Sequence, residues 1–292
     1  MGTGRRIVIV GAGGRLGAAL LREYAGDLQV TGFNRAQLDL SEPKRIHSAL
    51  DAVDFDVLIN TAAQTNVDRC ETERDEAFRL NAEAPRLLAK ICEKKKAKLI
   101  HISTDYVFDG EKRAPYVEED EARPISVYGE SKREGEKLVL AVGERHCVVR
   151  VSWIFGPDRP SFIDWVLQRA QENERVEAVS DKISTPTYTI DVAKMLRPLF
   201  MEAATDRLLH LANSGECSWQ EYGQWALDCA ARRGIPLKAK RVDGVSLGDM
   251  KNFVARRPVY TVLSTGKYQR STGQTPRDWH EAVADYVRAR HG

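Results

Sequence analysis

The sequence RIVIVGAGGRLG, residues 6–17, decides the fold because it joins an apolar run to a glycine-rich turn. The run is typical of a buried strand, and a helix is expected from about Arg15 to Tyr24. The glycines follow the spacing G-x-x-G-x-x-G. Between a strand and a helix, such a loop lets a pyrophosphate approach the backbone and the first N–H groups of the helix. We therefore predict a dinucleotide site that contains Gly11, Gly14 and Gly17.

Strands and helices alternate through the first half of the chain. Further strands are expected at residues 28–33, 56–62, 97–103 and 146–152, with helices at 42–53, at 74–93 and around 128–132. Apolar strands connected by helices are typical of a parallel sheet covered on both faces. The predicted fold class is therefore α/β, a Rossmann-type doubly wound parallel sheet.

The second half is less regular. We expect strands at residues 176–180 and 207–212, helices at 188–203, 218–233 and 277–290, and a loop-rich segment at 235–275. The expected organisation is one unit over residues 1–292. In it, about 1–155 mainly bind the dinucleotide, and about 156–292 contribute a small C-terminal substrate lobe over the carboxyl ends of the strands.

The composition of the chain excludes several classes of function. The chain has 292 residues and a net charge of +2, so we expect no nucleic-acid partner. No apolar run approaches membrane-spanning length, and the opening MGTGRR lacks the apolar core of a signal peptide. The five cysteines have no zinc-site spacing, so we expect reduced thiols, no metal and a cytoplasmic location. The sequence is compatible with a homodimer.

The end of the second strand bears on the choice of cofactor. An acidic residue there would bind the ribose of NAD, but this chain has Gly32-Phe33-Asn34-Arg35. The Arg35 guanidinium favours the 2′-phosphate of NADPH, with NADH as the alternative cofactor. An exposed arginine stacked on adenine is the competing interpretation. Asp39 and Leu40 are expected to hold the adenine.

The segment SVYGESK, residues 126–132, places Tyr128 and Lys132 four residues apart. On a helix these side chains share a face, and an ammonium beside a phenol lowers the pKa of the phenol. That arrangement suits a tyrosine that transfers a proton near neutral pH. A surface Tyr/Lys pair would give the same pattern, so the motif alone is weak.

Polar and small residues follow the third and fourth strands. Ala62 and Ala63 would let a cofactor lie close to the backbone, and Thr104 offers a hydroxyl to a substrate carbonyl. His101 alternates into the sheet, and we interpret it as a packing histidine.

Pro85 interrupts the predicted helix at 74–93. Proline has no N–H for the carbonyl of Asn81, so a kinked helix would leave that oxygen free for a water or a lysine. A helix that restarts at Pro85 is the alternative.

Because it combines these features, the chain resembles members of the extended short-chain dehydrogenase/reductase superfamily. Within that superfamily, it resembles the dTDP-4-dehydrorhamnose reductase family. The similar segments span nearly the whole chain: GAGGRLG, LDLSEP, NTAAQTNVDRCE, NAEAPRLLA, HISTDYVFDG, PISVYGESKREGE, VVRVSWIFG and RRPVYTVLST. The resemblance implies that NAD(P)H reduces the C4 ketone of a nucleotide-linked deoxy sugar, dTDP-4-dehydro-L-rhamnose, to dTDP-L-rhamnose.

The resemblance also implies residue roles. Tyr128 would donate the proton, Lys132 would hold the nicotinamide ribose, and Thr104 would stabilise the reacting oxygen. Asp105 and Trp153 would contact the sugar. A tryptophan that caps the core is the competing interpretation for Trp153, and the segment SWIFG favours the sugar contact. The residues expected to touch the dinucleotide are Gly14, Arg15, Leu16, Asp39, Leu40, Ala63, Gln64 and Thr65. The Asn81 carbonyl would bind a water that leads to the lysine.

The chain departs from the family pattern at two places. Val151 replaces a usual threonine, and the segment DKISTPT at 181–187 differs from a pattern like DQFGSPT. We expect Lys182 and Ser184 to lie where the sugar nucleotide passes.

Two other functions fit the same motifs. One is a non-catalytic regulatory subunit that binds a dinucleotide and a partner enzyme, and the retained Thr104, Tyr128 and Lys132 argue against it. The other is a nucleotide-sugar epimerase or dehydratase. Asp105-Tyr106 lacks the Asp-Glu pair of such dehydratases, and an epimerase would turn over without net use of cofactor.

Overall fold

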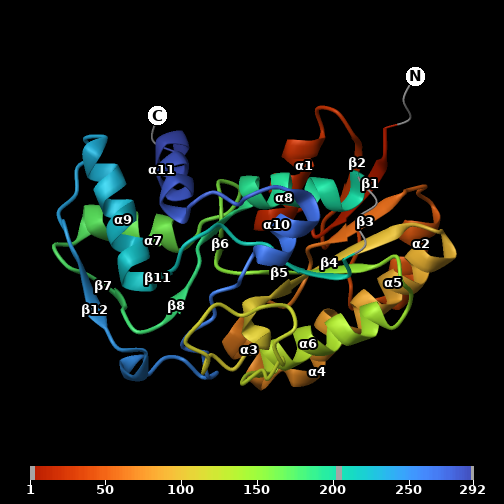
Figure 1. Ribbon diagram of the computed structural model, residues 1–292, viewed down its shortest axis with the longest axis horizontal. Coiled ribbons are helices and arrows are strands. Elements are labelled where there is room, and N and C mark those ends of the chain that lie inside the picture. The colour runs from red at the N-terminus through yellow and green to blue at the C-terminus, as the bar shows by residue number, and fades with distance from the viewer. Residues whose placement is uncertain (1–3, 202–205, 291–292) are drawn as a thin grey trace.

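A six-stranded parallel sheet forms the centre of the molecule (Figure 1). The computed structural model describes residues 4–201 and 206–290. The strands run in the order β10, β5, β4, β3, β1, β2, and every neighbouring pair is parallel. They are β1 (Arg6–Val10), β2 (Gln29–Phe33), β3 (Val57–Asn60), β4 (Lys98–Thr104), β5 (Cys147–Val151) and β10 (Leu208–His210). The strand order reverses between β1 and β3, and ligands of open α/β sheets bind outside such a switch point.

Helices cover both faces of the sheet because successive side chains of a strand point to opposite sides. Ile7 and Ile9 pack with α1 (Arg15–Tyr24) and α8 (Thr189–Met201). The alternate residues of β1 belong to the core under α2 (Pro43–Asp51), α5 (Ala84–Lys94) and α6 (Val127–Leu140). The predicted doubly wound sheet is thus confirmed, and α1 has the predicted bounds.

The predicted helix at 74–93 is three pieces. α4 (Arg74–Phe78) runs into a π-helical turn (Arg79–Glu83) and then into α5, with a short α3 (Val67–Thr72) before them. Pro85 lies in the first turn of α5, where its missing N–H costs little. The wider π-helical turn accommodates Pro85. The helix is therefore neither a single α-helix with a kink nor two helices with a break at Pro85.

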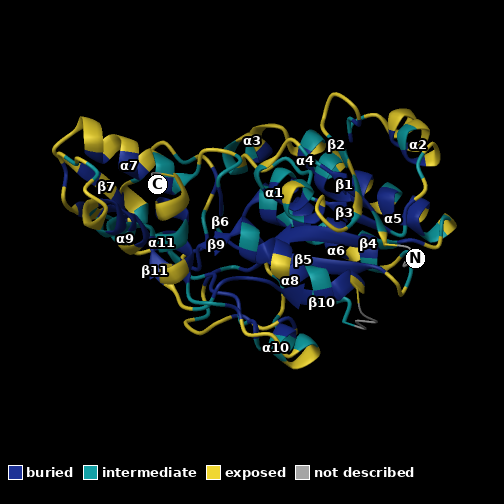
Figure 2. Ribbon diagram, turned by 90° about the horizontal axis from the view of Figure 1, so that it is seen from above, coloured by how far each residue is buried: buried dark blue, intermediate teal, exposed yellow. Residues whose placement is uncertain are grey.

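A second hydrophobic core lies in the C-terminal part of the chain. It is built from α7 (Phe162–Glu172), β7 (Val176–Val179), α9 (Trp219–Arg232), β12 (Val242–Val245) and α11 (Trp279–Arg290), with β7 and β12 paired. Figure 2 shows this lobe beside the sheet, with buried residues inside each part. Short strand pairs, β6 (Ile154–Phe155) with β9 (Thr187–Tyr188) and β8 (Ile183–Ser184) with β11 (Cys217–Ser218), connect the two parts.

Two expectations for the C-terminal half were incomplete. Helix α7 was not expected, and the segment 235–275 contains β12, the 3₁₀ turn Leu247–Asp249 and α10 (Gly266–Thr272). The helix expected at 188–203 is α8, and its last two expected positions fall outside the described residues. Among the helices of residues 4–201 and 206–290, none combines the length and apolarity needed to cross a membrane.

Candidate active site

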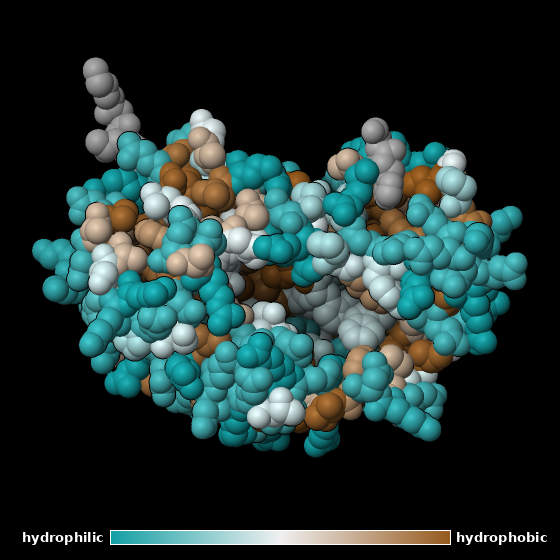
Figure 3. Space-filling view, turned by 180° about the vertical axis from the view of Figure 1, so that it is seen from behind, coloured by the Kyte–Doolittle hydropathy of each residue, from teal (hydrophilic) through white to brown (hydrophobic). Residues whose placement is uncertain are grey.

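A cavity of about 980 Å³ opens at the carboxyl ends of β1 to β4. Figure 3 shows a hollow between the two parts of the molecule, with hydrophobic side chains at its floor. Apart from Gly17, Lys182 and Ser184, the residues predicted to bind the cofactor or the sugar nucleotide, or to act in catalysis, line this cavity: Gly11, Gly14, Arg15, Leu16, Arg35, Asp39, Leu40, Ala62, Ala63, Gln64, Thr65, Thr104, Asp105, Tyr128, Lys132 and Trp153. Gly17 lies behind the loop.

The glycine loop leaves no space for a side chain at two of its three predicted glycines, Gly11 and Gly17. Gly11 has φ +87°, and a Cβ on it would stand 2.7 Å from the hydroxyl of Thr61. A Cβ on Gly17 would stand 2.2 Å from the Gly11 carbonyl oxygen, so this glycine lets α1 pack on the loop. The helix begins after Gly14 with neither a capping side chain nor an acidic residue in its first turn. Its first N–H groups are therefore suited to an anion such as a pyrophosphate.

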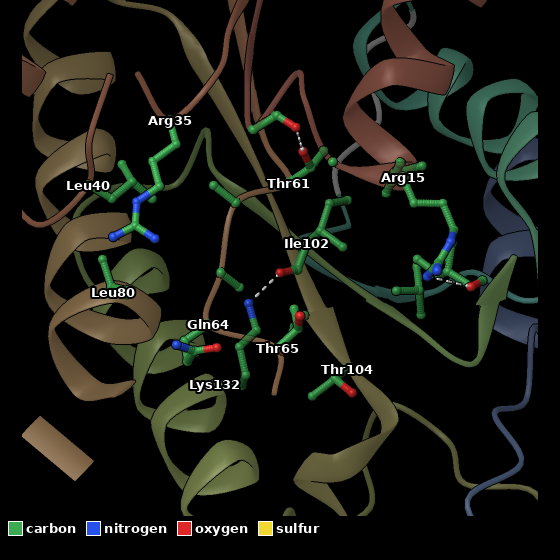
Figure 4. A pocket seen from close by; sticks show the side chains of 18 of the residues that line it. Arg15, Arg35, Leu40, Thr61, Gln64, Thr65, Leu80, Ile102, Thr104 and Lys132 are labelled. Carbon is green, nitrogen blue, oxygen red and sulfur yellow. Dashed lines mark hydrogen bonds between the residues drawn. The ribbon is translucent and has the colours of Figure 1, made fainter. Parts of the chain in front are cut away.

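Arg35 lies at the end of the cavity that contains Leu40 and Leu80 (Figure 4). Its side chain is 74% exposed, and Nε lies 3.4 Å from Oδ2 of Asp39. Hydrogen bonds from the Ser41 N–H and hydroxyl hold the pKa of the Asp39 carboxyl below its ordinary value. Asp39 thus holds the guanidinium in position while most of it remains exposed to solvent. A phosphate at this end of the cavity could therefore reach it.

Tyr128 and Lys132 come from the first two turns of α6 and reach the same cavity. Ser126 begins the helix, since its side chain accepts a hydrogen bond from the Gly129 N–H. The Tyr128 ring meets that of Tyr106 edge-on, with centroids 5.6 Å apart. Burial raises the pKa of Tyr128, and a hydrogen bond with Thr104 opposes that rise.

The expected lowering of the tyrosine pKa by the lysine is wrong for the free protein. Lys132 Nζ donates instead to the carbonyl oxygen of Ile102, at 2.6 Å, and lies 3.3 Å from Nε2 of His101. Figure 4 shows the lysine pointing toward β4. Burial lowers the pKa of Lys132 to about 8. The structure therefore brings the two residues to one cavity with the lysine bound to the strand.

Sequence reasoning placed His101 in the core but missed its polar contacts. This fully buried histidine contacts Lys132 through Nε2 and the Asn60 side chain through Nδ1, at 3.1 Å. Burial, and then the charge of Lys132, lower its pKa well below the ordinary value. A polar residue in the otherwise apolar run of β4 was the available signal.

Asp105 lies buried at the other end of the cavity, directly after β4. Its Oδ2 accepts hydrogen bonds from the hydroxyls of Thr261 (2.6 Å), Ser152 (3.3 Å) and Ser184 (3.3 Å). Its Oδ1 accepts from Thr104, at 3.1 Å. Burial raises the pKa of Asp105, and these bonds oppose the rise. A carboxylate surrounded by four hydroxyls is a fixed acceptor in the cavity wall. The hydroxyl oxygens of Ser152 and Ser184 also lie 2.5 Å apart, so either of these two can donate to the other in place of Asp105.

Lys182 lies behind this wall and not, as expected, in the path of a ligand. It is fully buried, as is Ser184, and neither lines the cavity. The Lys182 ammonium donates to the Pro258 carbonyl and stands 5.0 Å from the centre of the Tyr106 ring. Burial lowers its pKa to about 8, although the charge of Asp105 acts in the opposite direction.

Trp153 both lines the cavity and packs on the C-terminal core. Its ring lies 5.6 Å from that of Trp219 and 6.4 Å from that of Tyr222. Its φ of +37° is unusual for a residue with a side chain. Within the described part of the chain, its buried indole N–H finds no hydrogen-bond acceptor. Strain and an unpaired donor at a cavity are typical of ligand-binding positions.

Sequence reasoning also missed Arg159, which lines the cavity. Its guanidinium donates to the Gly13 carbonyl from Nε (2.9 Å) and Nη2 (2.6 Å), so the segment after β6 touches the glycine loop. Arg15 makes the reciprocal contact with the carbonyl of Ile154, at 3.2 Å. In the described residues, no cluster of three or more His, Cys, Asp or Glu could hold a metal ion.

Comparison with known proteins agrees with this geometry. The family model described as RmlD substrate binding domain matches residues 5–291. The dTDP-4-dehydrorhamnose reductase of Mycolicibacterium smegmatis is 36% identical over 98% of this chain and 86% of its own. A probable dTDP-4,6-dihydroxy-2-methyloxan-3-one 4-ketoreductase of Streptomyces antibioticus is 34% identical over 98% of this chain and 97% of its own.

A solved structure shares the whole architecture. The dTDP-4-dehydrorhamnose reductase of Bacillus anthracis, in complex with NADP, superimposes with a TM-score of 0.92 at 29% identity, over 98% of this chain and 99% of that one. The match extends over both the sheet and the C-terminal lobe. This chain therefore belongs to the dTDP-4-dehydrorhamnose reductase family.

Proposed function

We propose that this enzyme reduces the C4 ketone of dTDP-4-dehydro-L-rhamnose to give dTDP-L-rhamnose, with NADPH as the preferred cofactor and NADH as the alternative. The observation that carries the proposal is the convergence of Thr104, Tyr128 and Lys132 on the cavity that the glycine loop enters. A phenol, a hydroxyl and an amine beside a dinucleotide site are the groups that carbonyl reduction requires.

The protein's part in the reaction is to orient the ketone and supply a proton. A bound nicotinamide dinucleotide supplies the hydride that the ketone carbon receives. The Tyr128 phenol donates its proton to the former carbonyl oxygen, and its raised pKa keeps that proton in place until charge develops there. The Thr104 hydroxyl now donates to Asp105, so it must turn toward the substrate oxygen to stabilise it.

Asp105 and Trp153 are proposed to hold the sugar. Asp105 offers a fixed carboxylate, and Trp153 offers a flat ring for the apolar face of a deoxyhexose. At the opposite end, Arg35 is proposed to bind the 2′-phosphate of NADPH. In this proposal, residues up to about 155 mainly bind the dinucleotide, and the later residues complete the sugar site.

The proposal also concerns where the enzyme works. All five cysteines are free thiols and buried, which suits the reducing cytoplasm. A nucleotide sugar is the proposed partner, and a homodimer is compatible with it.

The deciding experiment follows NADPH absorbance with a dTDP-4-keto sugar and identifies the product. The expected result is one NADPH consumed for each ketone reduced. Turnover of the sugar without net loss of NADPH would indicate an epimerase. Absence of turnover together with tight binding to another enzyme would indicate a regulatory subunit.

A further inference from the structure

A chain of four contacts runs from the end of β3 to Lys132. The Ala62 N–H donates to Oδ1 of Asn60, at 3.1 Å, and Nδ2 of the same amide lies 3.1 Å from Nδ1 of His101. On the other side of the ring, Nε2 lies 3.3 Å from Nζ of Lys132. The Lys132 amine then donates to the Ile102 carbonyl, at 2.6 Å. Asn60, His101 and Lys132 are all buried.

Donor and acceptor roles along this chain are fixed from one end. The Ala62 N–H can only donate, so the oxygen of the Asn60 amide faces it and the NH₂ group faces His101. Nδ1 of His101 must therefore accept, which puts the proton of the neutral ring on Nε2. That N–H points at Lys132, where an ammonium has no lone pair to receive it.

A neutral lysine resolves the conflict. A primary amine accepts from the His101 N–H with its lone pair and still donates to Ile102. With an ammonium, two donors would face each other somewhere along the chain. The parallel pairing of β3 with β4 places Asn60 beside His101, so the fold itself builds the arrangement.

We propose that Asn60 and His101 are positioning residues that direct an imidazole N–H at Lys132 and so favour its neutral form in the free enzyme. The proposal deepens the assigned function, because it rests on Lys132 working beside Tyr128. In its charged form, such a lysine is a stronger acid than an ordinary ammonium, so it transfers a proton more readily once Tyr128 has lost its own. Burial lowers the pKa of Lys132 to about 8, which is the same direction as the effect of this arrangement.

The other groups around Lys132 do not remove the conflict. Tyr128 lies one turn before it on α6 and stays protonated near neutral pH. Glu136, one turn after, favours the ammonium, but its carboxylate is held by Arg150 at 2.7 and 2.8 Å. From β4, the polar groups that reach the amine are His101 and the Ile102 carbonyl.

The tautomer of His101 is directly measurable without any activity. Nitrogen NMR of ¹⁵N-histidine-labelled protein, with His101 assigned through His101→Asn, should show a proton on Nε2, a bare Nδ1 and no titration between pH 5.5 and 8. A proton on Nδ1, or titration in that range, would overturn the proposal whatever the enzyme's substrate is.

The kinetic consequence is tested with Asn60→Asp and Asn60→Leu. The carboxylate of Asn60→Asp should accept from Nδ1 and move the ring proton there, so Nε2 becomes an acceptor for an ammonium. The alkaline limb of the pH profile of kcat/KM should move to higher pH by roughly one unit. This shift corresponds to an increase of about tenfold in the affinity of Lys132 for its proton. Asn60→Leu should move it in the same direction, since it also frees the tautomer without adding charge.

His146 provides the matched control. It is a buried histidine at the start of β5, where its Nδ1 accepts from the Leu99 N–H, at 3.3 Å. His146→Gln should leave the alkaline limb in place. If only Asn60→Asp moves the limb, the added charge explains the shift and the tautomer does not. If wild-type enzyme reduces no 4-keto sugar nucleotide, the proposed substrate fails while the NMR result still decides this inference.

Discussion

Gly135 on α6 lies directly against the carbonyl oxygen of Asn81, because a Cβ at this glycine would stand 2.1 Å from that oxygen. The contact joins the helix of Tyr128 and Lys132 to the π-helical turn before α5. The Asn81 side chain adds to it, since its Nδ2 donates to Ser131, at 3.0 Å. Here the absence of a side chain sets the position of α6, and with it the positions of the candidate catalytic groups.

Gly135→Ala is therefore expected to push α6 away from the turn. Overpacking of this kind costs about 1–3 kcal/mol, so the free energy of unfolding in urea should fall by that amount. Turnover should fall more than NADPH affinity, because the shift acts on Tyr128 and Lys132. Gly26→Ala is the control, since a Cβ at Gly26 meets nothing within 4 Å. Equal stability of the two variants would contradict the packing argument.

Tyr128→Phe should keep the fold and the cofactor affinity while kcat falls by about 10²–10⁴. Only the proton-donating hydroxyl is removed, and the edge-on contact with Tyr106 is kept. Titration of NADPH by fluorescence and steady-state kinetics separate the two effects. A near-wild-type kcat would rule out Tyr128 as the acid.

Arg35→Ala should raise KM for NADPH more than KM for NADH. A charge-assisted contact with a phosphate contributes about 1.5–3 kcal/mol, which is roughly 10- to 150-fold. Arg45→Ala is the control, because Arg45 is an exposed arginine on α2 that pairs with Glu42, at 2.9 Å, outside the cavity. A similar change for both cofactors would favour stacking on adenine over recognition of the phosphate.

Acid should destabilise the protein through its buried histidines. Burial lowers the pKa of His210 to about 3, whereas an unfolded histidine takes up its proton near pH 6.5. Below pH 6.5 the unfolded state binds more protons, so the free energy of unfolding falls with falling pH. His210 should contribute about 2 kcal/mol of this loss between pH 7 and 5.

The slope of stability against pH is the measurement for this prediction. His210→Asn should flatten it, while replacement of the exposed His47 should leave it unchanged. An unchanged slope in His210→Asn would mean that His210 takes up its proton at the same pH in the folded protein as in the unfolded chain.

The sheet could be predicted from the sequence because it depends on short local patterns, and the same patterns brought most of the candidate site residues to one cavity. The bounds of α1 were correct because the glycine loop and the apolar spacing fix its start and its buried face. Helix α7 was missed, although Ser161 and Asp164 form a capping box that marks its first turn. The contacts of His101 were out of reach, since they follow from the register of β3 against β4.

The pKa shifts and hydrogen bonds of the site were harder to predict than the residues that form it. Helical spacing correctly put Tyr128 and Lys132 on the same helix, but it does not say what the amine binds. The carbonyl of Ile102 competes for it, and burial outweighs nearby charge in the pKa of both groups. Likewise, the sequence placed Lys182 in the substrate path, whereas tertiary packing places it behind Tyr106 and Asp105.

Because of that position, substitution of Lys182 tests how the wall of the cavity determines substrate preference. Its buried ammonium stands 5.0 Å from the Tyr106 ring and 6.0 Å from the Trp153 ring, and its charge acts on Asp105. Lys182→Gln removes that charge and restores the family-like residue. Asp105 and the two rings should then shift, so KM for the sugar nucleotide should change by roughly tenfold, which corresponds to about 1.4 kcal/mol. NADPH affinity should stay the same.

Lys98→Gln separates this effect from the general loss of a half-buried ammonium. Lys98 lies at the start of β4 and donates to the Leu199 carbonyl, at 2.6 Å, at the far end of the strand from Thr104. It should alter stability but not KM. Adding Ser184→Gly to Lys182→Gln removes one hydroxyl donor from Asp105 and should change the ranking of different dTDP-4-keto sugars further. An unchanged ranking in the double variant would mean that the wall formed by Asp105 and Trp153 is set without these two residues.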